Sequence, residues 1–440
     1  MKIKNLFKRL FFAALSILLI LSATACAPKQ AGSDVILDKD DLQNNTSNES
    51  TEHTFVWEYL DEWNFPAFEA SKMQRVEILF RDNYFEDIPD AKTTATAVSE
   101  AFIKDYYDTV DLSNPTKVTD ALLYCYVDVV ADIYSYYRTA PQYSDYQGNL
   151  SGNFVGIGIT ATYSTTENAI LVVTVLEDSP AIKAGLAVGD LILEVDGVAV
   201  TAENYQTTLD AIKGEAGKSV HLKVKRGETI TEYDIVRANV MERSVKYSLS
   251  EDKIGYVQIK SFKSNTDEQF KEAIDYLTEN GAVAIIYDLR NNGGGYLDSV
   301  ENMLDYIAPK GTTLVSFSNN YKSPYVAKTS HSVSLPSVVI CNKNTASAAE
   351  LFTAGIRDLS DMGHFDATIV GTVTHGKGIV QTTYTLSDKS AVTMTVAYYN
   401  PPSGQNYNGV GITPDVKVDL TKDGDAQLDS AYEEIQKLIK

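Results

Sequence analysis

A serine and a lysine far apart in the chain have the surroundings of a nucleophile and its base. Ser347 precedes an apolar helical pattern in NKNTASAAELFTAG (342–355), and Lys377 stands in the Gly-Lys-Gly turn of THGKGIVQ (374–381). A serine hydroxyl is a poor nucleophile at neutral pH and needs a neighbouring base to accept its proton. A lysine amine can be that base only where burial keeps it unprotonated, because its ordinary pKa is about 10.4. The two residues therefore predict nucleophilic catalysis by a Ser-Lys pair.

Gln381 is expected to orient that lysine. It lies four residues beyond Lys377, in the segment GIVQTTYTL (378–386), which predicts a strand. Residues an even number apart in a strand share a face, so the glutamine amide would hydrogen-bond the lysine without adding charge.

A glycine-rich loop predicts where negative charge would be stabilised. The segment AVAIIYDLRNNGGGYLDSVENML (282–304) has the pattern of an apolar strand, a loop and a helix. The backbone N–H groups of Gly294 and of Ala348, the residue after the serine, would form an oxyanion hole for a tetrahedral intermediate. A phosphate-binding loop is disfavoured because the pattern GxxxxGK[ST] is absent.

Each motif also has a purely structural interpretation. Ser347 and Glu350 fit a helix capping box, in which the serine oxygen only accepts a backbone N–H. A Gly-Lys-Gly turn between strands is, taken alone, usually a turn with a solvated lysine. Neither motif decides between structure and catalysis by itself.

Together and in this order, LRNNGGG, NTASAAE and GKGIVQ resemble the carboxyl-terminal processing proteases, also called tail-specific proteases, which are Ser-Lys peptidases. The resemblance extends upstream to FVGIGI (154–159) and SPAIKAGLAVGDLILEVDG (179–197). The resemblance implies that Ser347 is the nucleophile, Lys377 the general base and Gln381 its orienting partner. It also implies that Gly294 and Ala348 are the oxyanion donors.

Two residues depart from the family's pattern. Gly293 stands where the family usually has proline, which makes the loop more flexible. His375 stands where the family usually has phenylalanine, and it is a second candidate base because histidine titrates near neutral pH. We expect Gly293 to lower turnover rather than to abolish the chemistry, and His375 leaves open which residue is the base.

The N-terminal residues have the pattern of an export signal. A basic start is followed by an apolar run, and Ala23-Thr24-Ala25-Cys26 resembles the lipobox of bacterial lipoproteins. Residues 1–25 are predicted to be a lipoprotein signal peptide and Cys26 to be lipidated; an ordinary signal peptide or an uncleaved anchor is the alternative. Residues 26–53 are polar and acidic and predict a flexible linker. The protein would then be exported and lipid-anchored on the outer face of the cytoplasmic membrane or on the periplasmic side.

Charge, cysteine and histidine content restrict the partners. The chain has 38 Lys and Arg against 59 Asp and Glu, a net charge of −21, which argues against nucleic acid or anionic lipid as a partner. Cys125 and Cys341 lie in apolar segments and are expected to be buried singly, with a disulfide as the alternative. The histidines are scattered and HExxH is absent, so we predict no metal and no cofactor.

Periodicity divides the remaining chain into three regions, which predicts a multidomain α+β fold. In residues 54–150, apolar residues recur at helical spacing over 68–85, 94–110 and 117–137, which predicts a helical N-terminal region. In the family this platform often takes part in dimerisation, so the resemblance implies a homodimer as one assembly.

Residues 151–238 have short β-like runs and a small helix at SPAIKAGL, which resemble a PDZ domain. Its carboxylate-binding loop would be Gly156, Ile157, Gly158 and Ile159, whose backbone N–H groups would bind the terminal carboxylate of a peptide. The same glycines imitate a dinucleotide-binding pattern, but strand-like residues follow them where a helix is required.

Residues 239–440 alternate strands and helices and end with further strands and one helix, which predicts a mixed α/β protease domain with a β-rich end. The whole sequence predicts an exported serine endopeptidase that binds protein or peptide substrates by their free C-termini through the PDZ domain and cleaves them at Ser347. The alternative is a catalytically silent PDZ-containing binding lipoprotein.

Overall fold

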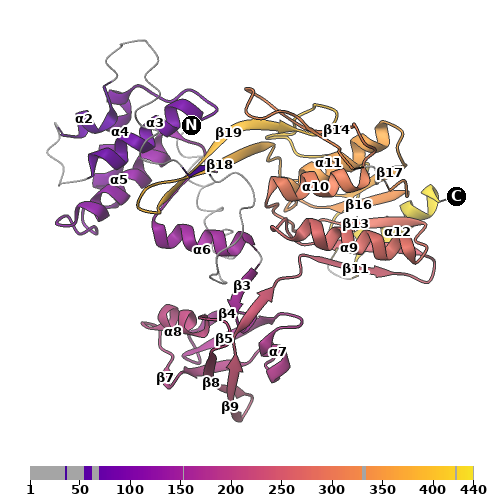
Figure 1. Cartoon of the computed structure of the whole chain (residues 1–440), viewed down its shortest axis with the longest axis horizontal. Coiled ribbons are helices and arrows are strands. Elements are labelled where there is room, and N and C mark those ends of the chain that lie inside the picture. The colour runs from indigo at the N-terminus through magenta and orange to yellow at the C-terminus, as the bar shows by residue number, and fades with distance from the viewer. Residues whose placement is uncertain are drawn as a thin grey trace. The chain divides into compact units, whose positions relative to one another are not determined.

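The computed structural model describes residues 35–36, 54–61, 69–151, 153–329, 333–421 and 424–439. These residues form two compact units, which are drawn in Figure 1. One unit contains Ser144–Ser244 and Lys263–Asn265. The other contains the described residues of Ala31–Tyr143, Val245–Phe262 and Thr266–Lys440, and it therefore holds both the serine and the lysine segment.

The N-terminal part of the larger unit is helical, as predicted. Its helices are α2 (Val56–Asp61), α3 (Ala70–Asn83), α4 (Ala91–Asp105) and α5 (Pro115–Val130). Two of them begin at capping side chains: Asp90 accepts a hydrogen bond from the Thr93 N–H (3.0 Å), and Asn114 accepts one from the Lys117 N–H (3.2 Å). These caps fix where α4 and α5 begin, and the apolar faces of the helices share one core.

The helix predicted over 117–137 is wrong in its last turns. α5 ends at Val130, because Ala131 has an extended backbone. The next regular element is β2 (Tyr136–Arg138), which pairs antiparallel with β19 (Ala391–Asn400). Pairing with a strand from the far end of the chain outweighs the local helical periodicity.

A six-stranded sheet lies at the centre of the α/β part of the same unit. Its strand order is β11-β12-β13-β16-β17-β20, and only β11 runs antiparallel to its neighbour. The strands are β11 (Val245–Leu249), β12 (Ile254–Ile259), β13 (Ala284–Asp288), β16 (Ser337–Cys341), β17 (Ala367–Gly371) and β20 (Val416–Lys417). The helices are α9 (Thr266–Glu279), α10 (Leu297–Ile307), α11 (Ala348–Asp361) and α12 (Ala426–Leu438).

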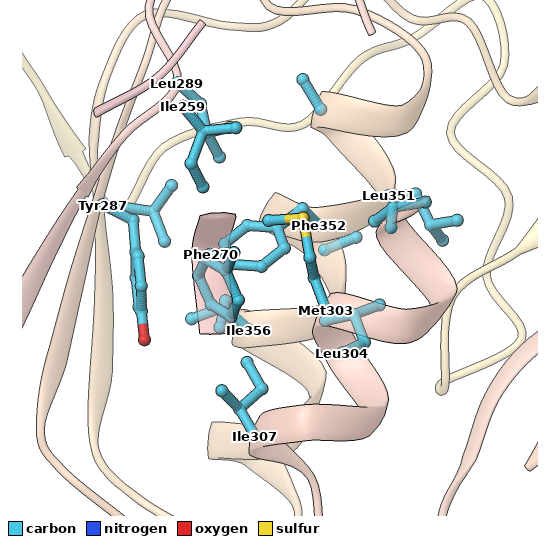
Figure 2. Packing of buried hydrophobic residues seen from close by; sticks show 14 of the residues in the cluster. Ile259, Phe270, Tyr287, Leu289, Met303, Leu304, Ile307, Leu351, Phe352 and Ile356 are labelled. Atoms are coloured by element: carbon cyan, nitrogen blue, oxygen red, sulfur yellow. The ribbon is translucent and has the colours of Figure 1, made fainter. Parts of the chain in front are cut away.

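Helices cover both faces of this sheet. Tyr287 of β13 belongs to the same core as Phe270 of α9, Leu304 of α10 and Phe352 of α11, which Figure 2 shows packed together. Ile286, the neighbouring residue of β13, instead packs in the core that includes α12. This alternation along a fully buried strand is what the apolar run in the sequence predicts for a strand with both faces covered.

A second sheet has the order β1-β18-β19-β14-β15, with β2 beside β19. Its further strands are β1 (Val35–Ile36), β18 (Ile379–Thr385), β14 (Thr313–Phe317) and β15 (Tyr325–Val326). The β18–β19 hairpin contributes to the core of the N-terminal helices, so this sheet joins the two parts of the unit. Strand β1 pairs in parallel with β18 and lies within the stretch predicted to be a flexible linker.

The smaller unit is a β domain. Its sheet has the order β4-β5-β6-β8-β9, with β7 beside β6, and β3 pairs antiparallel with β10. Its elements are β3 (Asn153–Gly156), β4 (Ile159–Ser164), β5 (Ala169–Val175), α7 (Pro180–Ala184), β6 (Leu191–Val195), β7 (Val198–Ala199), α8 (Tyr205–Ile212), β8 (Ser219–Arg226), β9 (Thr229–Val236) and β10 (Ala238–Met241), and α6 (Ala140–Ser151) leads into them. The predicted helix α7 is present, with Ser179 and Gly185 as its caps. Helix α8 was not predicted, because its threonines favour a strand locally while its apolar face packs on the core.

Several predictions have a definite outcome at this level. The multidomain fold class is confirmed. Cys125 and Cys341 are both buried and free, as expected. Residues 1–25, Cys26 and most of the linker lie outside the described residues, and the domain boundaries remain predictions. Within the part of the chain that is described, no helix is both long and apolar enough to cross a membrane.

Candidate active site

Ser347 lies at the start of α11 on a strained turn. Its φ of +58° is one that residues other than glycine rarely adopt. Two hydrogen bonds hold the preceding loop: the Thr345 hydroxyl donates to the Leu289 carbonyl (2.8 Å), and the Ala346 N–H donates to the Asn292 carbonyl (2.9 Å). Such support from the neighbouring segment allows this strained turn to persist.

The glycine loop closely approaches the serine at Gly294. A Cβ atom at this position would lie 2.9 Å from Ser347 Cβ and 3.0 Å from the Ala348 nitrogen, and φ is +98°, so the position requires glycine. Ala348 is the first residue of α11, and its N–H has no acceptor within the helix. The two predicted oxyanion donors are thus neighbours. The Gly294 N–H donates to the Asn292 side chain (2.9 Å), a bond that it must exchange to receive an oxyanion.

The carboxylate of Glu350 joins the serine segment to the lysine segment. It is fully buried and accepts hydrogen bonds from the backbone N–H groups of Ser347 (2.9 Å), Gly376 (2.6 Å) and Lys377 (2.8 Å). The Thr374 hydroxyl donates to the same carboxylate (2.5 Å). One side chain therefore fixes the backbone of both predicted catalytic residues.

This role of Glu350 was not predicted. The sequence signal was the S-x-x-E spacing, which predicted a capping box, and the Ser347 N–H does bond to this carboxylate. The signal says nothing about the Gly-Lys-Gly turn, because that contact depends on the path of the chain between β17 and β18, which belong to different sheets.

Lys377 has the surroundings of a desolvated base. Its Nζ lies 4.5 Å from the centre of the Tyr134 ring, and its backbone carbonyl accepts a hydrogen bond from the Tyr399 hydroxyl (2.8 Å). Burial lowers the pKa of Lys377 to about 8, although the charges of Asp132 and Glu350 act in the opposite direction. A solvated lysine in a simple turn, the structural alternative, does not fit this environment.

Ser347 and Lys377 are brought to one place, but no direct hydrogen bond joins their side chains in the described part of the chain. Both lie close to Tyr399, whose pKa is raised by burial. Catalytic hydrogen bonds are often long before a substrate binds.

The hydrogen bond predicted between Gln381 and Lys377 is not formed. The Gln381 amide donates to the Thr395 hydroxyl instead (3.1 Å). The expectation of a shared face fails because Lys377 precedes β18, so the alternation of that strand does not extend to it. The pairing of β18 with β19 also shifts by one residue here, with Val396 of β19 as the extra residue.

The two residues that depart from the family's pattern have different surroundings. His375 Nε2 lies 3.2 Å from the Tyr134 hydroxyl, and its backbone N–H donates to the Thr345 carbonyl (3.0 Å). At Gly293 a Cβ atom would meet open space. The backbone at Gly293 is therefore not restricted to glycine by crowding.

In the smaller unit, the predicted carboxylate-binding loop connects β3 and β4. The Ile157 carbonyl accepts a hydrogen bond from the Ala181 N–H (2.8 Å), and the Gly158 carbonyl accepts one from the Leu176 N–H (2.9 Å). Gly158 has φ of +83° and lies against Ser179, so a side chain there would clash. The roles of Gly156, Ile157, Gly158 and Ile159 in binding remain predictions, as do those of the catalytic residues.

The described residues contain no group of three or more His, Cys, Asp or Glu side chains that could hold a metal ion. They do contain a serine at a strained helix start and a partly desolvated lysine, both in the unit that is built on the six-stranded sheet. They also contain a separate β domain. This combination is typical of a serine peptidase with a substrate-binding module.

Comparison with known proteins supports that class. The family model "Peptidase family S41" matches residues 253–418, and the model "PDZ domain" matches residues 171–226. The chain is 32% identical over 324 residues to the carboxy-terminal processing protease CtpA of Bacillus subtilis (strain 168), across 73% of this chain and 67% of that protein. It is 34% identical over 319 residues to a protein of Staphylococcus haemolyticus named "Probable CtpA-like serine protease", across 71% of this chain and 62% of the relative.

The chain therefore belongs to peptidase family S41, and its relatives there include carboxy-terminal processing proteases. The resemblance stated from the sequence is confirmed, and so is the presence of a PDZ domain. The matched part spans 62% of the length of the Staphylococcus haemolyticus relative. Among solved structures, the photosystem II D1 C-terminal processing protease is 25% identical with a TM-score of 0.45, over 89% of this chain and 98% of that one.

Proposed function

We propose that this chain is a serine endopeptidase in which Ser347 is the nucleophile and Lys377 the general base. The observation that supports this most is that one carboxylate, that of Glu350, binds the backbone N–H groups of both Ser347 and Lys377. Burial lowers the pKa of the Lys377 amine at this place to about 8. At pH 7 roughly a tenth of such an amine is unprotonated, against less than about a thousandth of an ordinary lysine. That fraction is sufficient for a base that acts near neutral pH.

The proposed reaction begins when the unprotonated Lys377 amine accepts the proton of the Ser347 hydroxyl while Oγ attacks the scissile carbonyl carbon. The carbonyl oxygen becomes an oxyanion, which receives hydrogen bonds from the N–H groups of Ala348 and Gly294. Collapse of the tetrahedral intermediate breaks the C–N bond, and the Lys377 ammonium gives its proton to the leaving amine. Water then hydrolyses the acyl-enzyme by the same sequence and restores Ser347.

Substrate choice is assigned to the PDZ domain. Its loop at Gly156–Ile159 would bind a free C-terminal carboxylate, and the peptide would add a strand to the sheet edge. The CtpA relatives are named for carboxy-terminal processing, which agrees with this proposal. We further propose that the protein is exported and anchored to the membrane through a lipid on Cys26.

One observation favours the alternative, a catalytically silent binding lipoprotein. The side chains of Ser347 and Lys377 are not hydrogen-bonded to each other, although both segments are well described. A silent protein would use the PDZ domain to bind protein C-termini and would leave peptide bonds intact.

Cleavage of a peptide with an apolar free C-terminus tests the proposal. The parent protein should cleave it, and Ser347→Ala and Lys377→Ala should each lose activity by about a thousandfold or more, since each removes a reacting group. Lys343→Ala is the matched control, because this lysine is exposed in the same loop as the serine and takes no part in the proposed reaction. Lack of cleavage by the parent, together with tight binding of the peptide, would establish the silent protein instead.

Recognition of the substrate's C-terminus and lipidation of Cys26 are tested separately. Amidation of the peptide's C-terminus should raise KM, and equal kinetics for the free and the amidated peptide would refute tail recognition. Mass spectrometry of the mature N-terminus should find a diacylglyceryl group on Cys26, and Cys26→Ser should abolish it. An unmodified mature N-terminus at another residue would refute the anchor.

A further inference from the structure

The turn between α5 and β2 reaches the surroundings of Lys377 from the helical part of the larger unit. We propose that Asp132 and Tyr134 of this turn are positioning residues for Lys377, so that the peptidase site is incomplete without the N-terminal helical region. The inference rests on the proposed role of Lys377 as the base. No motif in the sequence connects these residues: Tyr134 and its hydrogen-bond partner His375 are 241 residues apart.

Asp132 is held rigidly between the turn and strand β19. Its carboxylate accepts hydrogen bonds from the hydroxyls of Thr395 (2.7 Å) and Ser135 (2.8 Å) and from the Tyr134 N–H (3.0 Å). Its own backbone N–H donates to the Tyr84 hydroxyl (2.8 Å). A carboxylate with this many partners keeps its charge at a fixed place.

The Thr395 hydroxyl extends this arrangement to Gln381. It donates to Asp132 and accepts from the Gln381 amide (3.1 Å). Gln381, which the sequence predicts to bond to Lys377, is therefore connected to the Asp132 carboxylate through the Thr395 hydroxyl. The Gln381 amide thus has Thr395 as its partner in place of Lys377.

Tyr134 contacts the lysine directly. The Lys377 ammonium lies over its ring, 4.5 Å from the ring centre, which is a cation–π contact. Its hydroxyl lies 3.2 Å from His375 Nε2, two residues before the lysine. The ring thus stabilises the charged form of the amine, while the hydroxyl holds the Gly-Lys-Gly turn.

The charges around Lys377 act in opposite directions. Burial favours the neutral amine, and the carboxylates of Asp132 and Glu350 favour the ammonium. The other groups that face this turn are the Tyr134 ring, the His375 imidazole and the Tyr399 hydroxyl. Without the charge of Asp132 the pKa of Lys377 falls further, and the amine becomes a weaker base.

The reactivity of the Lys377 amine toward acetic anhydride, measured against pH by mass spectrometry of the labelled peptide, tests this inference without requiring cleavage. The protein carries Ser347→Ala to prevent acylation of the serine, and Lys377 is half-buried rather than fully enclosed. The midpoint should lie near pH 8 in this background. Asp132→Asn, which keeps an acceptor for Thr395, should lower the midpoint by about half a pH unit or more.

The control is Asp108→Asn, which removes the same charge from an exposed position of the helical region and should not move the midpoint. A folded Asp132→Asn protein with the control's midpoint would overturn the role of Asp132. Tyr134 provides a second, independent comparison: Tyr134→Leu should lower the midpoint, whereas Tyr134→Phe, which keeps the ring, should not.

Equal midpoints for the Leu and Phe variants would overturn the role of Tyr134. If Asp132→Asn does not fold, the comparison of Tyr134→Leu with Tyr134→Phe still tests the inference. Failure of the parent protein to cleave any peptide would refute the proposed function, but it would leave these midpoints measurable.

Discussion

The serine side and the lysine side of the candidate site are built differently. The serine side, residues 288–294 and 342–350, consists of two loops at the ends of adjacent parallel strands, with hydrogen bonds that run between them. The lysine side, residues 374–381, depends on residues from elsewhere: Glu350 of α11, Asp132 and Tyr134 of the helical region, and Tyr399 of β19. The proposed nucleophile is thus placed by local geometry, and the proposed base is tuned by long-range assembly.

Glu350→Gln should have the largest effect among changes that leave both predicted catalytic side chains in place. The amide keeps one acceptor oxygen but turns an N–H₂ group toward backbone N–H donors, so the Gly-Lys-Gly turn loses part of its support. We expect kcat to fall by about a hundredfold and stability to fall by about 1–3 kcal/mol. Steady-state kinetics and urea unfolding measure the two effects. Unchanged kcat would show that the two sides are placed independently.

Arg290→Met tests the serine side as a structural unit. Arg290 bonds to Asp288 and to Asp425, the N-cap of α12, and the Asp288 side chain is only 2% exposed. Removing the arginine leaves a buried carboxylate without its cation, so the free energy of unfolding should fall by about 3 kcal/mol.

Asp425→Asn is its control, because the Asp425 side chain is 41% exposed and its loss should cost less than about 1 kcal/mol. Equal losses of stability for the two variants in denaturant unfolding would contradict this description of the network.

Glu301→Gln tests the raised pKa of a carboxyl group that lies outside the candidate active site. Burial, with a contribution from Asp298, raises the pKa of Glu301 to about 7. The folded protein therefore holds this proton more tightly than the unfolded chain, and the associated stability is present below about pH 4.5 and lost as pH rises to about 7. The variant should gain up to a few kcal/mol over the parent at pH 8 and little at pH 4, with unchanged cleavage. Thermal unfolding at both pH values would show an equal difference if the carboxyl group were not perturbed.

Gln381→Ala should have the smallest effect among the changes at the candidate active site. Its amide bonds to Thr395 and not to Lys377, so we expect kcat to fall less than about tenfold. A loss as large as that of Lys377→Ala in the same peptide assay would mean that the glutamine turns to the lysine during the reaction.

The sequence predicts the serine side of the site better than the lysine side. The helix that starts after Ser347 and the closeness of Gly294 to Ala348 follow from local patterns of capping and glycine, and the structure contains both. The contribution of Asp132 and Tyr134 has no local pattern, because it arises only when β2 pairs with β19. The orientation of Gln381 was mispredicted because Lys377 precedes β18, so the alternation of that strand does not relate the two side chains.

The pH dependence of kcat/KM for a free-tail peptide tests the central claim most directly, because His375 lies two residues from Lys377 and is the rival base. A base must lose its proton to act, so activity should rise with pH through the pKa of that base. The dyad predicts a rise with a midpoint near pH 8, unchanged in His375→Phe and absent in Lys377→Arg. A rise centred near ~6.5 that disappears in His375→Phe would contradict the account and make His375 the base.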